Sequence, residues 1–183
     1  MTKVFIGGSR RITKLNSAIK MRADSIMQNN YLILIGDASG ADKSMQGYFA
    51  EKGYKDVLVF CAGNTCRNNV GNWKTKHVGP ERDKKDAGFY TLKDIEMAKE
   101  ADYGFMIWDA KSKGTLHNIF SLLRSQKKVL VYFSPEEKFL TIKAIDDFLP
   151  ILAKCDRKAA ELVESERKAS GSSTEKQQAL NLG

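Results

Sequence analysis

Cysteines and long apolar runs are scarce in this sequence of 183 residues. No run approaches the roughly 18 apolar residues of a membrane-spanning helix, so we expect no membrane association. The three cysteines are odd in number and wrongly spaced for a disulfide framework or a zinc knuckle. We therefore expect Cys61, Cys66 and Cys155 to be free thiols, no metal site, and a cytoplasmic protein. Because a predicted strand begins almost at Met1, no signal peptide is expected.

Two glycine-rich signatures of nucleotide-binding proteins are also missing. The chain has neither the Gly-x-Gly-x-x-Gly of dinucleotide-binding folds nor the Gly-x-x-x-x-Gly-Lys-Ser/Thr of a P-loop. ATP hydrolysis of the P-loop type is therefore not expected. The net charge of +8 favours anionic partners, but the basic residues are dispersed and no nucleic-acid-binding signature is present. The charge thus indicates a surface that attracts anions rather than a dedicated nucleic-acid face.

What the sequence does contain is a regular alternation of apolar runs and amphipathic segments. Strands are predicted over 3–6, 31–35, 56–60, 103–108, 128–133 and, at an edge, 138–142, and helices over 13–28, 41–52, 92–100 and 116–126. This alternation is typical of parallel strands joined by right-handed crossovers. We therefore predict an α/β fold: a Rossmann-like three-layer α/β/α sandwich with a mostly parallel sheet of about five or six strands.

The rhythm breaks at residues 62–90, which are rich in glycine, asparagine and basic residues. We interpret residues 1–153 as one Rossmann-like nucleotide-binding domain with this basic loop as an insertion. Residues 154–183 are predicted to be a helical extension with a flexible tail from Ser170. The insertion is either a lid that stacks on a base and meets phosphates or a surface loop whose aromatic residues pack on the domain. Its lid candidates are Trp73, Arg82, Tyr90 and Lys93.

Three short loops carry most of the functional signal. They are Gly7-Gly8-Ser9-Arg10, residues 36–43, and residues 109–115, and each follows a predicted strand and precedes a predicted helix. In an open α/β sheet such loops meet at the carboxyl ends of the strands, where ligands bind. Small residues let backbone N–H groups approach an anion, and helix N-termini add favourable partial charge. The loops therefore predict a site for a phosphorylated small molecule, with a nucleotide as the first choice.

Each loop also has a purely structural interpretation. Arg10 could be a solvated side chain after an ordinary tight turn, and Asp42 could cap the helix that it begins. Thr115 is a natural N-cap. The candidate ligand-binding residues are Gly8, Ser9, Arg10, Gly36, Asp37, Ser39, Gly40, Asp42, Asp109, Ser112, Lys113, Gly114, Thr115 and Asn118.

Taken together, the loops resemble those of the SLOG superfamily, and most closely its YspA-like branch. The shared features are Gly-Ser-Arg after the first strand, Gly-x-Ala-Ser-Gly-Ala-Asp after the second, and Ser-x-Gly-Thr after the fourth. In the segment that follows, Ala87-Gly88, Met97 and Ala101-Asp102 fall in the order typical of the branch, and Lys93-Asp94 stands where the branch usually has Arg-Asn. The resemblance covers residues 4–131. It implies a Rossmann-like domain related to the DNA-processing Smf/DprA proteins and to the LOG phosphoribohydrolases.

The resemblance leaves three functions open. In LOG enzymes a glutamate serves cleavage of the N-glycosidic bond, and Asn118 stands at that position here. Because an amide cannot act as a general base, a nucleotide-binding or sensing domain is favoured over an N-glycosidic hydrolase of the phosphoribohydrolase or deoxyribosyltransferase type. If turnover occurs, the catalytic candidates are Asp94 and Glu96. The third function is DNA binding of the DNA-processing type. No cofactor beyond a nucleotide or nucleotide-derived ligand is expected, and relatives often form homodimers.

Overall fold

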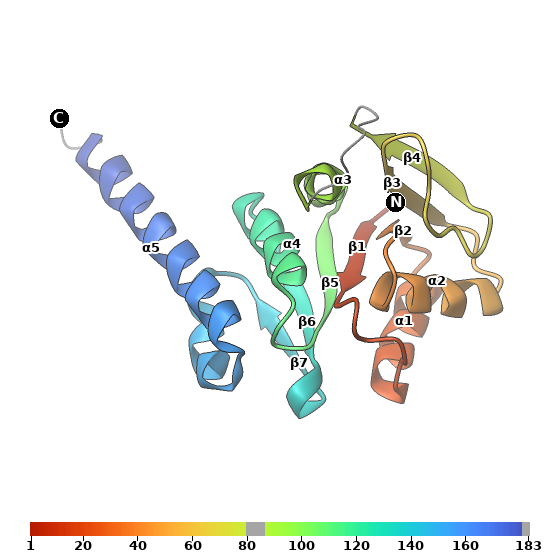
Figure 1. The fold of residues 1–183 in the computed structure, drawn as a ribbon, viewed down its shortest axis with the longest axis horizontal. Coiled ribbons are helices and arrows are strands. Elements are labelled where there is room, and N and C mark those ends of the chain that lie inside the picture. Colours follow the sequence, from red (N-terminus) through yellow and green to blue (C-terminus); the bar gives the residue numbers. More distant parts are fainter. Residues whose placement is uncertain (80–86, 181–183) are drawn as a thin grey trace.

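The computed structural model describes residues 1–79 and 87–180, and these form a single seven-stranded sheet with helices on both faces (Figure 1). The strand order is β4-β3-β2-β1-β5-β6-β7, and only the edge strand β7 is antiparallel to its neighbour. This confirms the predicted Rossmann-like three-layer fold with a mostly parallel sheet. The strands are β1 (Lys3–Gly8), β2 (Leu32–Gly36), β3 (Val57–Ala62), β4 (Lys74–Val78), β5 (Tyr103–Trp108), β6 (Val129–Phe133) and β7 (Lys138–Ile142).

The helices divide between the two faces of the sheet. One face packs on α1 and α2, and the other packs on α3, α4, the 3-10 segment η2 and the first turns of α5. A short 3-10 turn, η1 (Ser134–Glu136), joins β6 to β7. The helical segments are α1 (Ser17–Gln28), α2 (Ala41–Glu51), α3 (Ala87–Glu100), α4 (Lys113–Arg124), η2 (Ile145–Lys154) and α5 (Arg157–Leu180).

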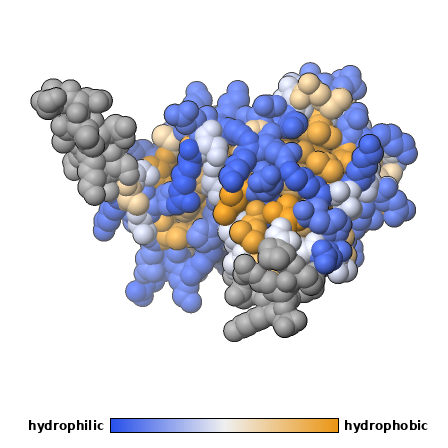
Figure 2. Space-filling view, turned by 90° about the horizontal axis from the view of Figure 1, so that it is seen from above, coloured by the Kyte–Doolittle hydropathy of each residue, from blue (hydrophilic) through white to orange (hydrophobic). Residues whose placement is uncertain are grey.

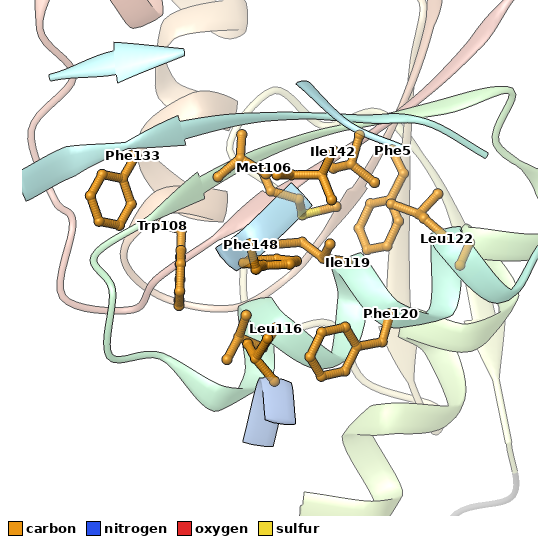
Figure 3. Close-up of a cluster of buried hydrophobic side chains, with 14 of the residues drawn as sticks. Phe5, Met106, Trp108, Leu116, Ile119, Phe120, Leu122, Phe133, Ile142 and Phe148 are labelled. Carbon is orange, nitrogen blue, oxygen red and sulfur yellow. The ribbon is translucent and has the colours of Figure 1, made fainter. Parts of the chain in front are cut away.

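The central strands are apolar throughout because both of their faces are buried. Along β1, Val4 and Ile6 pack on the α1/α2 side, whereas Phe5 points to the opposite side. Figure 3 shows Phe5 among side chains from β5 and α4, including Met106 and Leu122. Side chains on a strand alternate between its two faces, so a continuous apolar run is what a strand between two helical layers requires.

The strand order reverses beside β1: successive strands are first added on one side of β1 and then on the other. The chain proceeds from β1 outward to β4, returns through α3 to place β5 on the other side of β1, and then continues outward to β7. The loops that leave β1 and β5 therefore turn to opposite faces of the sheet. In open α/β sheets a crevice forms at such a switch point, outside the carboxyl ends of the strands.

The prediction of one long basic loop over 62–90 is wrong. Within it the strand β4 pairs in parallel with β3, and α3 begins at Ala87. This strand was not predicted because four of its five residues are polar, as is typical of an edge strand: Lys74-Thr75-Lys76-His77-Val78. Lysines on an edge strand discourage its pairing with other chains. A segment rich in lysine can therefore still form a strand at the edge of the sheet.

The C-terminal region also differs from its prediction. The helix α5 continues to Leu180, where a flexible tail from Ser170 was expected. Near its start, Ala159 and Val163 are fully buried against the core, and the helix then extends away from the sheet (Figure 1). The preceding segment contains Pro150, which cannot donate a backbone hydrogen bond, and is a 3-10 helix.

The cysteines do not all have the predicted state. Cys61 and Cys66 are joined by a disulfide, with their Cα atoms 5.0 Å apart, whereas Cys155 is free. The turn at Gly63, where φ is +66°, folds the chain back within five residues, which the spacing alone did not indicate. No helix among the described residues is long and apolar enough to cross a membrane. The space-filling view in Figure 2 shows hydrophilic side chains over much of one face, with apolar patches between them.

Candidate ligand-binding site

A cleft of about 1010 Å³ lies at the carboxyl ends of β1 and β5, beside the first turns of α2 and α4. This is the switch point of the sheet, where the three loops were expected to meet. The predicted ligand-binding residues that line the cleft are Gly8, Ser9, Arg10, Asp42, Ser112, Lys113, Gly114, Thr115 and Asn118. The structure also brings Tyr90, Lys93 and Asp94 from α3 to the same cleft. Five other predicted residues, Gly36, Asp37, Ser39, Gly40 and Asp109, are not part of its lining.

Ser9 ties the three loops together and is almost completely buried. Its backbone N–H donates to the Ile107 carbonyl at 2.9 Å, and its own carbonyl accepts from the Ala41 N–H at 3.1 Å. Its hydroxyl donates to an Asp109 carboxylate oxygen at 2.8 Å. The same carboxylate accepts the N–H groups of Lys111 and Ser112 through its other oxygen. Ser9 and Asp109 therefore hold the walls of the cleft in place, and their polar atoms are already occupied by one another.

Two glycines are required because the loops touch. A Cβ at Gly40 would lie 2.3 Å from the Arg10 carbonyl oxygen, and Gly40 has a φ of +76°. A Cβ at Gly8 would lie 2.4 Å from the Ile107 carbonyl oxygen. A side chain at Gly40 would push the second loop away from the first, and a side chain at Gly8 would push the end of β1 away from β5. The glycines thus serve the contact between the loops, and only Gly8 faces the cleft.

The first turn of α4 presents backbone donors to the cleft. Ser112 is the N-cap, and its hydroxyl oxygen accepts the Thr115 N–H at 3.4 Å and the Thr115 hydroxyl at 3.1 Å. The prediction that Thr115 is the N-cap is therefore wrong by three residues, and its buried side chain supports the cap instead. The N–H groups of Lys113 and Gly114 belong to the first turn, where a helix has no acceptor of its own to offer. They line the cleft together with the positive end of the helix dipole.

Five ionisable side chains, which we call the charged floor, form a network at and beneath the base of the cleft. They are Asp37, Asp42, Arg67, Lys93 and Asp94. Arg67 binds Asp37 through its side chain at 2.5 and 3.1 Å and through its backbone N–H at 3.0 Å. The Lys93 ammonium lies 2.6 Å from Asp94 and 4.0 Å from Asp37. Asp37 and Lys93 are buried, and burying a charge is costly unless it is paired in this way.

Burial disfavours the ionised form of Asp37, but its partners outweigh this effect. Hydrogen bonds from Arg67 and the positive charges of Lys93 and Arg67 hold the pKa of the Asp37 carboxyl below its usual value of 3.8. The same pairing keeps the pKa of the Arg67 guanidinium above its usual value, against the effect of its own partial burial. Asp37 is therefore ionised near neutral pH and engaged with the protein, rather than free to hold a ligand.

Asp42 has the opposite electrostatic state. Burial, together with the nearby charges of Asp94 and Asp37, raises the pKa of its carboxyl from 3.8 to about 7. The charge of Lys93 and a 3.3 Å hydrogen bond from the Ala38 N–H only partly oppose this. With Asp42 protonated, the charged floor holds two carboxylates, Asp37 and Asp94, and two cations, Arg67 and Lys93. Its net charge is then zero. A carboxyl group that exchanges its proton near pH 7 at the base of a cleft is chemically competent as an acid or base.

The Tyr90 ring lies beside two arginines that also line the cleft. The Arg67 guanidinium carbon lies 4.1 Å from the centre of the Tyr90 ring, and that of Arg10 lies 6.0 Å away. These are cation–π distances, in which the ring face attracts the cation. The structure thus brings the predicted lid residue Tyr90 to the cleft, where its ring lies beside cations.

The outer part of the cleft is basic, and part of it comes from an element that the loop motifs do not include. We define the cationic rim as Arg10, Arg11, Lys111 and Lys113, which are exposed side chains of the first and third loops. Beside it lie Arg157 and Lys158, together with Glu161, from the first turns of α5. The Asp156 N–H donates to the Ala110 carbonyl at 3.0 Å and fixes the start of that helix beside the third loop. No sequence signal pointed to α5, because only tertiary packing brings it there.

Two other predicted residues, Trp73 and Glu96, do not line the cleft. Trp73 donates its indole N–H to the Tyr54 carbonyl at 2.8 Å and packs on the α1/α2 core, so it is not a lid. Glu96 pairs with Lys76 on β4 at 3.1 Å, on the far side of α3 from Asp94. Arg82 lies outside the described residues. Of the two catalytic candidates, only Asp94 reaches the cleft.

Asn118 lies between the floor and the first turn of α4. Its amide is placed to donate to the Gly114 carbonyl at 3.2 Å and to an Asp94 carboxylate oxygen at 3.3 Å. Since Lys93 also donates to Asp94, that carboxylate is held in one orientation by two donors. Asn118 therefore positions an acid at the cleft and lines the cleft itself.

Comparisons with known proteins agree with the fold. The chain is similar in structure to DNA processing protein A from Helicobacter pylori, which binds single-stranded DNA. The TM-score is 0.58 at 15% sequence identity, over 92% of this chain and 81% of the other. DNA processing protein A belongs to the SLOG superfamily, whose loop motifs the sequence resembles. No protein-family model and no curated protein matches the chain by sequence, so the YspA-like branch stays a prediction.

Proposed function

We propose that the cleft binds a phosphorylated ligand of the nucleotide class, as a binding or sensing site. The observation that carries the proposal is the convergence of the first turn of α4 and the cationic rim on one cleft at the switch point. Backbone N–H groups at a helix N-terminus and arginine or lysine side chains are the donors that phosphates prefer. Among the described residues, no ion pair engages Arg10 or Lys113, so both remain available to an anion.

The phosphate is best accommodated against Lys113 and Gly114. A Cβ at Gly114 would meet nothing within 4 Å, so there is open space above these N–H groups. Arg10 lines the same cleft and can approach from the opposite wall. The charged floor cannot take this role, because the Asp94 carboxylate would repel an anion and Lys93 is already paired.

The remainder of a nucleotide would then extend toward the charged floor. Carboxyl and amide groups such as those of Asp42, Asp94 and Asn118 accept and donate hydrogen bonds that suit sugar hydroxyls. Phe5 and Met97 supply an apolar part of the lining. A phosphate site at the rim and a polar site below it match the two ends of a nucleoside monophosphate.

Single-stranded DNA is a second candidate ligand. It is favoured by the fold shared with DNA processing protein A and by the basic residues Arg157 and Lys158, which extend the rim along α5. Phosphates of a strand could occupy the same donors as a nucleotide phosphate. DNA binding would weaken steeply with added salt, because each neutralised phosphate releases counterions.

A screen of thermal shifts with nucleotides, nucleosides and short single-stranded DNA tests the proposal. We expect a nucleoside monophosphate to raise Tm, its nucleoside to raise it less, and mass spectrometry to recover the ligand intact. Gly114→Asp should remove the shift by placing a carboxylate against the phosphate, whereas Gly114→Ala is the matched control because the space is open.

The other outcomes separate the alternatives. Release of a free base would identify an N-glycosidic hydrolase, with Asp42 and Asp94 as its acids. A shift with DNA alone, lost at high salt, would favour the second candidate. No shift with any nucleotide, or equal shifts in Gly114→Asp and the unmodified protein, would refute the placement of the phosphate.

A further inference from the structure

A second cluster of reactive side chains lies on the α1/α2 side of the sheet. Within the described residues, Cys61, Cys66 and His77 place two sulfur atoms and an imidazole nitrogen within 4.8 Å of one another. Cys61 is the second-last residue of β3, Cys66 follows in the next loop, and His77 is on β4. None of the three lines the cleft, so the proposed function does not use this cluster.

The sheet itself places two of these residues together. Cys61 and His77 are direct partners in the parallel pair β3–β4, and partners in a ladder point to the same face. The turn at Gly63 then brings Cys66 back, so that its Cα lies 5.0 Å from that of Cys61. The Gly63 N–H donates to the Val78 carbonyl at 3.0 Å, which fixes the turn to β4. The cluster is thus set by backbone geometry.

The imidazole is oriented as in metal sites. The Nδ1 of His77 lies 2.7 Å from the Gly63 carbonyl oxygen, which can only accept, so Nδ1 carries the proton of the neutral ring. The lone pair is then on Nε2. Histidines that bind metals commonly donate their other ring N–H to a backbone carbonyl in this way, which fixes the tautomer and the ring.

We propose that, when the Cys61–Cys66 disulfide is reduced, the two thiolates and His77 bind a thiophilic divalent cation such as Zn²⁺. Two sulfurs and one imidazole form a known type of zinc donor set, with a fourth position for water. With Zn–S near 2.3 Å and Zn–N near 2.0 Å, tetrahedral ligand atoms lie roughly 3.5–3.8 Å apart. The observed cluster, with its atoms within 4.8 Å, is close to that spacing. Cysteine spacing alone did not indicate this site, because His77 joins the two cysteines only through the pairing of β3 with β4.

The disulfide and the metal site exclude one another, because the same two sulfur atoms form the disulfide bond or bind the cation. A dithiol reductant supplies two electrons and two protons, which convert the disulfide to two thiols while the reductant forms its own disulfide. Binding of the cation then releases the two thiol protons to solvent. Because Cys66 precedes Arg67, which holds Asp37 in the charged floor, the cluster lies one residue from a wall of the cleft.

The test uses the full chain, reduced with dithiothreitol, freed of reductant and metal under anaerobic conditions, and titrated with Zn²⁺ against a chromophoric chelator. We expect one equivalent bound per chain, and at least ~100-fold weaker binding in Cys66→Ser. Cys155→Ser is the matched control, because Cys155 is the free cysteine outside the cluster, and it should bind as the unmodified protein does. The oxidised protein, in which Cys61 and Cys66 form the disulfide, should not compete with the chelator for Zn²⁺.

Two further measurements keep the outcome clear if Cys66→Ser is poorly folded. In the unmodified reduced protein, Zn²⁺ should slow alkylation by a maleimide at Cys66, but not at Cys155, whereas Cys61 is buried and shielded in either state. His77→Ala should lose affinity, and its exposed position makes a folding defect small. Equal Zn²⁺ affinity in Cys66→Ser and the unmodified protein, or equal alkylation of Cys66 with and without Zn²⁺, would overturn the proposal. None of these readouts depends on nucleotide binding.

Discussion

The charged floor and the cationic rim occupy the same cleft but use their charges differently. In the floor, Asp37 and Lys93 are buried, and their charges are neutralised by Arg67 and Asp94 at hydrogen-bond distance. In the rim, the side chains are exposed, and Arg11 makes only a 3.5 Å ion pair with Asp109. Burial forces charges to pair, whereas exposure leaves them free to attract a ligand.

The comparison predicts that the two regions fail in different ways when altered. Changes in the floor should lower the free energy of unfolding, because they leave a buried charge without its partner. Changes in the rim should alter ligand affinity and leave stability almost unchanged. Four predictions, from the largest expected effect to the smallest, test this division.

The largest effect is expected at Lys93. Lys93→Met removes the ammonium group from between Asp94 and Asp37, and breaking such a buried pair costs about 3–5 kcal/mol. Lys113→Met, in the same cleft but in the exposed rim, should change stability by no more than about 0.5 kcal/mol. Urea unfolding of both variants gives the comparison. If both lose the same stability, the floor and the rim are not distinct.

The next effect concerns the pH dependence set by Asp42. Its pKa is about 7 in the folded protein and 3.8 in the unfolded chain, so the folded state binds more protons between these values. Stability contributed by this group is therefore lost as the pH rises from about 4 to about 7. Asp42→Asn carries no charge at any pH and should escape this loss.

The difference in stability between Asp42→Asn and the unmodified protein is the quantity to measure. It should increase in favour of the variant by about 2 kcal/mol between pH 5 and pH 7, from the two pKa values of Asp42. Urea unfolding at both pH values supplies it. A difference that stays constant with pH would mean that Asp42 is ionised like an ordinary carboxylate.

The third effect tests the contact between the first two loops. Gly40→Ala places a Cβ against the Arg10 backbone at a positive φ, and backbone strain alone should cost about 1–3 kcal/mol. Gly47→Ala is the matched control within α2, because a Cβ there meets nothing within 4 Å, and it should stabilise by about 1 kcal/mol. Thermal unfolding distinguishes them. Loss of the same stability in both variants, or no loss in Gly40→Ala, would contradict a requirement specific to Gly40.

The smallest effect on stability, but a clear effect on binding, is expected at Arg10. Arg10→Ala removes one charge-assisted hydrogen bond to a phosphate, worth about 1.5–3 kcal/mol, so affinity for a nucleoside monophosphate should fall roughly 10–100-fold. The urea midpoint should not move by a measurable amount. Calorimetric titration gives the affinity. Unchanged affinity would remove Arg10 from the site.

The sequence predicted the fold and the cleft because both depend on local patterns. The apolar runs of β1 and β5 and the small residues of the three loops place Arg10, Lys113 and Gly114 at the switch point by topology alone. The role of Ser9 as a link between loops could not be predicted, since a serine in a loop is equally compatible with binding a ligand.

The charged floor was beyond sequence reasoning for a different reason. Lys93 and Asp37 are far apart in the chain and meet because α3 packs over the sheet beside β2. Arg67 binds Asp37 from the loop between β3 and β4. The position of this loop depends on the polar strand β4, which was not predicted. Pairing between distant charged residues depends on tertiary packing, and no local pattern encodes it.

An amide-resolved NMR titration with a nucleoside monophosphate tests the central claim most directly. If the first turn of α4 and the rim bind the phosphate, the largest shifts of amide signals should fall on Lys113, Gly114 and Arg10, and the nucleoside without phosphate should leave these signals unchanged. Shifts confined to residues away from the cleft, such as those of α1, or no shifts at all, would contradict the account.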